Sequence, residues 1–175
     1  MVRGVSADAQ LVLGHGASGS AASMRPYVDA LRQLHIRADA IELPKGNAER
    51  AKARFAARLH AAPAPAIGGH SYGGRVASLV AAERSVPALV LISYPLHRPG
   101  HTEELRTEHW PDIACPVLVL SGEADPFARI DLLRQEVQRL RRSTVHTWPG
   151  IGHGLLSVVE AAADHIAAFL RTVLN

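Results

Sequence analysis

Short apolar segments alternate with amphipathic segments along the chain. Residues 89–93 and 117–120 are almost continuously apolar, which is typical of strands buried in a parallel sheet. In residues 24–34, apolar side chains recur at intervals of three and four, which predicts a helix with one apolar face. By the same criteria we expect strands over residues 11–13, 38–43, 66–68, 89–93, 117–120 and 144–148. Helices are expected over residues 24–34, 48–60, 75–84, 127–141 and 156–173.

This alternation of strands and helices places the chain in the α/β class. Successive βαβ units are right-handed and give a mostly parallel sheet with helices on both faces. Since no internal repeat and no linker divides the sequence, we expect a single domain over residues 1–175. The longest irregular segment covers residues 94–111, and we expect it to be too short for a lid domain.

Composition and charge exclude several classes of protein. Hydrophobic residues make up 47% and charged residues 20%, which excludes a disordered or low-complexity chain. Cys115 is the only cysteine, so an intrachain disulfide is excluded. The net charge is +3 and the basic residues are scattered, so we expect no nucleic-acid partner. Without a long apolar run or a signal-peptide core, we expect no membrane partner and a cytoplasmic location.

A G-x-S-x-G motif spans Gly69 to Gly73, with Ser71 at its centre. It lies directly between a predicted strand and a predicted helix, the setting in which a sharp turn exposes a nucleophilic serine. Glycines are needed on both sides because side chains there would collide across so tight a bend. The alternative is a glycine-rich turn that only packs a helix on the sheet. The context favours a nucleophile at Ser71.

A serine nucleophile needs a base and a group that orients the base. Asp125 and His153 each follow a predicted strand by five residues, at the carboxyl ends where doubly wound sheets place their sites. Glu123 is the alternative acid, but Asp125 is preferred because Pro126 makes the chain rigid directly after it. His153 is preferred among ten histidines because glycines flank it on both sides.

Backbone amides would stabilise the oxyanion that forms at the substrate carbonyl. We expect the N–H groups of Tyr72 and Ala17, the latter in the loop that follows the first strand. A glycine turn with a structural His15 is the alternative for this loop. The candidate pocket residues are His15, His70, Tyr72, Tyr94, Trp110 and Trp148, and the aromatic ones have an equally good explanation as core. Together with the 94–111 segment, they predict a shallow and open site.

Three histidines in or near the long irregular segment, His97, His101 and His109, suggest a metal site at first sight. Pro99 and Gly100 separate the first two, and no H-E-x-x-H motif is present, so we expect no metal. No glycine-rich nucleotide-binding motif is present either, and we expect no cofactor.

Four segments together resemble the α/β-hydrolase superfamily: residues 11–17, 68–75, 92–97 and 116–122. They look similar to a group of small hydrolase-like proteins that includes dienelactone-hydrolase-like proteins, a testis-expressed protein and a subunit of a histone acetyltransferase complex. This resemblance implies a minimal hydrolase fold with six parallel strands in the order 2-1-3-4-5-6, without the first two strands of the full fold. It also implies Ser71 as nucleophile, Asp125 as acid and His153 as base.

The expected function is therefore hydrolysis of a small carboxylic ester or thioester through an acyl-enzyme. The rival hypothesis is a non-catalytic binding or scaffold module that retains the fold, as in the acetyltransferase-complex branch. Neither hypothesis defines the oligomeric state.

Overall fold

The computed structural model describes residues 10–174, so the amino-terminal segment on which the signal-peptide expectation rests lies outside the described residues. Within residues 10–174, six strands form one sheet in which all neighbours are parallel, in the order β2-β1-β3-β4-β5-β6. The strands are β1 (Leu11–Gly14), β2 (Ala38–Ile41), β3 (Ala66–His70), β4 (Leu89–Ile92), β5 (Val117–Gly122) and β6 (Ser143–Trp148). The predicted strand order is confirmed.

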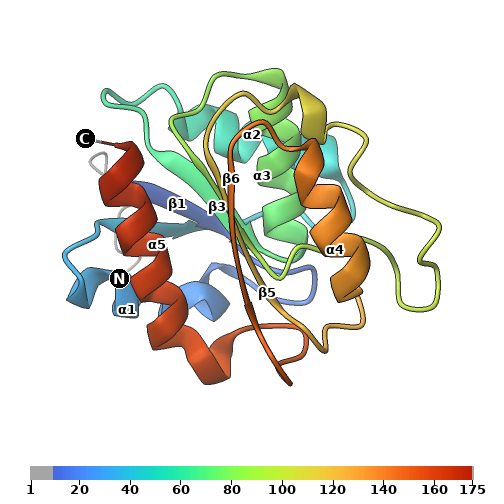
Figure 1. Ribbon diagram of the computed structural model, residues 1–175. Coiled ribbons are helices and arrows are strands. Elements are labelled where there is room, and N and C mark those ends of the chain that lie inside the picture. The colour runs from blue at the N-terminus through green and yellow to red at the C-terminus, as the bar shows by residue number, and fades with distance from the viewer. Residues whose placement is uncertain (1–9, 175) are drawn as a thin grey trace.

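Helices cover both faces of this sheet. They are α1 (Arg25–Gln33), α2 (Ala48–Arg58), α3 (Tyr72–Glu83), α4 (Ile130–Glu136) and α5 (Val159–Val173). Short 3₁₀ helices span Ala21–Met24, Trp110–Asp112, Val137–Arg139 and Leu156–Val158. The α1 and α5 helices pack side by side on one face, and α2, α3 and α4 pack on the other (Figure 1).

Burial on both faces explains the continuous apolar runs. In β4, Leu89 and Leu91 pack toward α3, while Val90 and Ile92 pack toward α1 and α5. All four side chains are fully buried. A polar residue at any of these positions would lose water without gaining a partner, which is why the pattern does not alternate.

Several elements have other bounds than the sequence predicts. The β3 strand extends to His70 and α3 begins at Tyr72, so a single residue, Ser71, connects them. The helix predicted from residue 127 begins only at Ile130, because Asp125 first holds a turn: its carbonyl accepts from the N–H of Ala128 and its carboxylate accepts from the N–H of Phe127. None of the described helices has the length and hydrophobicity needed to cross a bilayer.

Candidate active site

Ser71 has an uncommon backbone conformation, with φ of 50° and ψ of −115°. Its N–H donates to the carbonyl of Ile92 at 2.9 Å, which ties the turn to β4. A Cβ atom at Gly69 would lie 2.4 Å from the carbonyl oxygen of Gly14, and one at Gly73 would lie 2.2 Å from the same oxygen. The two glycines therefore let α3 approach β1 closely, while Ser71 holds the strained conformation between them.

His153 lies between Ser71 and Asp125, although the three residues are far apart in sequence. Its Nε2 is 2.9 Å from Oγ of Ser71, and its Nδ1 is 2.8 Å and 3.0 Å from the two carboxylate oxygens of Asp125. With the proton on Nδ1 donated to Asp125, Nε2 is free to accept the Ser71 hydroxyl proton. The arrangement is an unbroken hydrogen-bonded path from hydroxyl to imidazole to carboxylate.

Asp125 and Glu123 share one loop but have different surroundings. The Asp125 side chain is fully buried, and its Oδ1 also accepts from the N–H of Phe127 at 2.8 Å. Glu123 instead accepts from the hydroxyl of Thr147 at 2.7 Å and from Arg134 at 3.0 Å. Asp125 is thus the carboxylate that reaches His153.

His70 also lies beside His153, with 5.2 Å between the ring centroids. Burial, reinforced by the charge of His153, lowers the pKa of His70 to about 4, so its imidazole is neutral at pH 7. Its Nε2 is buried without a hydrogen-bond partner among the described residues.

A hollow of about 220 Å³ opens beside His153 and His70. Its apolar wall consists of Met24, Tyr27 and Leu156, and its remaining lining comes from the loop after β1 and from the turn that carries His153. Leu156 is 58% exposed at this site. Sequence reasoning assigned Met24 and Tyr27 only to a helix face. Their place directly after the His-Gly loop was the signal that could have assigned them to the site.

Residues 7–168 match a family model described as an alpha/beta hydrolase domain. The chain belongs to the α/β-hydrolase family. Among solved structures, this hydrolase is similar to the Paleococcus ferrophilus monoacylglycerol lipase, with a TM-score of 0.79 and 16% identity over 93% of each chain. It is also similar to Est1E from Butyrivibrio proteoclasticus with bound ferulic acid, with a TM-score of 0.78 and 14% identity over 97% of this chain and 91% of that chain.

A third similar structure is a membrane phospholipase A described as a novel bacterial virulence factor. Its TM-score is 0.79, with 19% identity over 98% of this hydrolase and 81% of that chain. Identities this low show a shared fold alone. Membership in the narrower dienelactone-hydrolase-like group stays a prediction.

Three expected pocket residues of the hydrolase are core residues instead. His15 is fully buried, its Nδ1–H donates to the carbonyl of Gly16 at 2.7 Å, and its Nε2 accepts from the N–H of Leu43 at 3.0 Å. Tyr94 and Trp110 are buried and pack edge to face at 5.1 Å. The 94–111 segment thus turns its aromatic side chains into the core, and a wall made by them is a wrong prediction.

The two remaining aromatic candidates also point away from the hollow. Trp148 packs against His146 and His165, with ring centroids 4.4 Å and 5.7 Å away. The Tyr72 hydroxyl donates to the carbonyl of Pro44 at 2.9 Å. In their place, Phe127 packs on the His153 ring with a centroid distance of 4.4 Å.

The two expected oxyanion donors lie on loops next to Ser71. Tyr72 is the first residue of α3, directly after Ser71. Ala17 follows Gly16, at which a Cβ atom would lie 3.8 Å from Cβ of Ser71. The loop after β1 therefore passes close to the serine, as an oxyanion loop must.

The histidines of the long segment have separate partners. His97 accepts from the N–H of Arg129 at 3.1 Å, and His109 is 2.7 Å from the Ser78 hydroxyl. His101 groups with Glu103 and Glu104 at the surface, but Glu104 already binds Arg98. Exposed acidic groups of this kind are common without a metal ion.

Proposed function

We propose that the protein is a serine hydrolase that cleaves small carboxylic esters or thioesters through an acyl-enzyme. One observation carries the proposal: a buried carboxylate, an imidazole and a half-buried serine hydroxyl are joined by hydrogen bonds of 2.8 Å and 2.9 Å. This arrangement gives a weak nucleophile a base and gives the base a fixed tautomer.

In the proposed reaction, Oγ of Ser71 attacks the substrate carbonyl carbon while Nε2 of His153 takes the hydroxyl proton. The tetrahedral oxyanion accepts hydrogen bonds from the N–H groups of Tyr72 and Ala17. The protonated imidazole, stabilised by Asp125, then donates its proton to the leaving alcohol or thiol. Water attacks the acyl-enzyme by the same route in reverse, which releases the acid and restores the serine.

The size of the hollow supports small substrates. At about 220 Å³ it is smaller than the roughly 300–1,000 Å³ of sites for drug-sized ligands. Its apolar wall suits a short acyl chain or one aromatic ring. The lipase and ferulic-acid-bound Est1E among the similar structures support an ester substrate in the same general sense.

The test combines a fluorophosphonate probe with a screen of p-nitrophenyl esters and acyl thioesters. We expect labelling in the native protein and none in Ser71→Ala. Asp125→Asn should lower kcat about 10⁴-fold through loss of the correct tautomer, as in related triads, whereas Glu123→Gln should change it less than tenfold. Absence of Ser71-dependent labelling and turnover would favour the non-catalytic scaffold hypothesis.

A further inference from the structure

The outer side of β6 has unpaired backbone groups. The strand forms one end of the sheet and pairs only with β5. The N–H of Val117 donates to the carbonyl of Arg142, and the N–H of Glu123 donates to the carbonyl of Trp148. The even-numbered residues of β6 therefore direct their backbone N–H and C=O groups toward β5. In a parallel ladder the alternate residues, Ser143, Val145 and Thr147, turn their N–H and C=O groups outward. In the described part of the chain, no hydrogen bond reaches these outward groups.

The β6 strand also lacks the features that usually protect an edge. Its sequence, Ser-Thr-Val-His-Thr-Trp, contains no proline, lysine, arginine or acidic residue. Val145 is 37% exposed, and it and Leu156 are the exposed large hydrophobic residues among those described. Edge strands in monomers are normally short, charged, bulged or covered, because an open edge pairs with another strand.

The opposite edge, β2, shows such protection. It has four residues and includes Asp39. The N–H of Leu11 donates to the carbonyl of Arg37, so the backbone groups of the next residue, Ala38, point away from the sheet. The carbonyl of Ala38 accepts a hydrogen bond from Arg32 Nη2 at 3.1 Å. An arginine therefore binds one outward carbonyl at the β2 edge, whereas no hydrogen bond reaches the outward groups of β6 in the described part of the chain.

We propose that β6 pairs antiparallel with β6 of a second copy of this chain, about a twofold axis at Val145. In this register Val145 faces Val145 of the second copy, and Ser143 faces Thr147. All three outward residues then form hydrogen-bonded pairs, and the two sheets become one continuous sheet. The outward groups are arranged symmetrically about Val145, so the strand is its own complement.

The side chains fit the same register. Thr144 lies opposite His146 of the second copy, and Arg142, whose Nη2 donates to the carbonyl of Ala114 at 2.9 Å, lies opposite Trp148. No two charges of the same sign face each other between residues 142 and 148.

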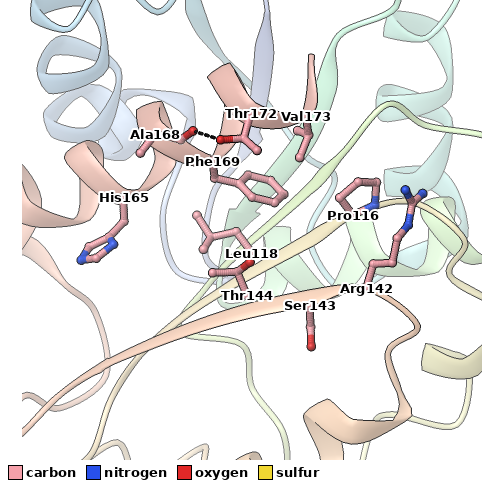
Figure 2. A pocket seen from close by; sticks show the side chains of 10 residues that line it. All are labelled: Pro116, Leu118, Arg142, Ser143, Thr144, His165, Ala168, Phe169, Thr172 and Val173. Carbon is pink, nitrogen blue, oxygen red and sulfur yellow. Dashed lines mark hydrogen bonds between the residues drawn. The ribbon is translucent and has the colours of Figure 1, made fainter. Parts of the chain in front are cut away.

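A hollow beside β6 supports this pairing. It has a volume of about 400 Å³ and lies between β6 and α5 (Figure 2), and no triad residue lines it. Leu118, Phe169 and Val173 give it an apolar lining, and Ser143 and Thr144 lie along the strand. Because the twofold axis is perpendicular to the sheet, both α5 helices lie on the same face of the combined sheet. The second copy would therefore cover this lining.

The first test measures mass by analytical ultracentrifugation. We expect about 37 kDa for the native protein, twice the 18.7 kDa of one chain. In Val145→Lys two cations would meet at the axis, so the dissociation constant should rise at least about tenfold. Val145→Thr should remain a dimer, and so should Leu156→Lys, which removes the other exposed hydrophobic residue. A native protein that is monomeric up to about 100 µM, or a Val145→Lys dimer as tight as the native one, would refute the proposal.

The second test examines the register by oxidative cross-linking. In Val145→Cys the two cysteines face each other at a Cα separation of about 5.5 Å, within disulfide range, so we expect a disulfide-linked dimer. In Ser143→Cys the two cysteines are offset by four residues, about 13 Å, and no cross-link should form. Cys115 is buried and does not compete. Equal cross-linking of both variants would contradict the proposed axis.

Discussion

His70 and Ser71 are neighbours in sequence, and each has an unfavourable state. Ser71 has a positive φ, a backbone conformation that residues other than glycine rarely adopt. His70 buries an imidazole nitrogen that has no hydrogen-bond partner among the described residues. Such local costs persist only where the surrounding structure holds them, and they concentrate at functional sites. Both residues lie within reach of one imidazole, that of His153.

The lowered pKa of His70 predicts a pH-dependent stability. The folded pKa of about 4 lies below the value of 6.5 for a free imidazole, so between these values the unfolded chain binds more protons. The free energy of unfolding should therefore fall as the pH drops from about 6.5 to 4, by up to about 3 kcal/mol from this group. Urea unfolding of the native protein and of His70→Gln at pH 7.5 and pH 4.5 measures this.

We expect the variant to lose less stability than the native protein over this range. It should keep a residual slope, because burial also lowers the pKa of His109 and His146. Equal losses in both proteins would show that His70 does not remain neutral in the folded state.

At the scale of elements, the irregular 94–111 segment is fixed by a buried polar cluster. Thr107 is fully buried, and its hydroxyl donates to the carboxylate of Glu136 at the end of α4. Arg139 donates to Glu136 at 3.0 Å and to the Thr107 hydroxyl at 3.2 Å. A segment without regular secondary structure is therefore held in place by side chains, which neither periodicity nor propensity reports.

Glu136→Ala should destabilise the protein by about 2–3 kcal/mol. The substitution leaves the buried Thr107 hydroxyl without its acceptor, and hydrogen bonds to charged groups in such sites contribute about this amount. The matched control is Glu104→Ala, since Glu104 pairs with Arg98 on the surface of the same segment and should contribute far less to stability. Urea unfolding compares the two variants, and similar losses would refute a special role of the buried cluster.

For the whole molecule, the sequence was sufficient to predict the sheet but not the residues that line the site. Strands such as β4 are apolar on both faces, and this constraint is visible in the sequence because it applies to every residue. The hydrogen bonds that join Ser71, His153 and Asp125 fall on residues that the motif and loop positions had already marked.

The pocket was mispredicted for a physical reason. The sequence around an aromatic loop residue does not show whether its side chain lines a cavity or packs in the core. Tyr94 and Trp110 pack in the core. Only the packing of the loop against α3 and α4 decides between the two. The wall that Met24 and Tyr27 provide likewise depends on how α1 is oriented beside the loop after β1.

The reactivity of Cys115, the only cysteine in the sequence, should report global unfolding of the protein. Cys115 lies buried just before β5, and burial raises its pKa to about 11. Relative to an unperturbed thiol, this lowers the thiolate fraction near pH 8 about 100-fold, before the effect of blocked access. Reaction with a disulfide reagent should thus be at least that much slower in native buffer than in urea. Fast labelling of the native protein would contradict the buried position.

The α1–α5 layer has a consequence for biosynthesis. The ribosome completes α5 after every other described element, yet Ala163, Ile166 and Leu170 of α5 are fully or almost fully buried against the sheet face that it shares with α1. Until these residues emerge, much of the apolar surface on one face of the nascent sheet remains exposed to water and prone to aggregation. Chaperones that bind apolar surfaces would therefore protect this chain mainly until α5 has left the ribosome.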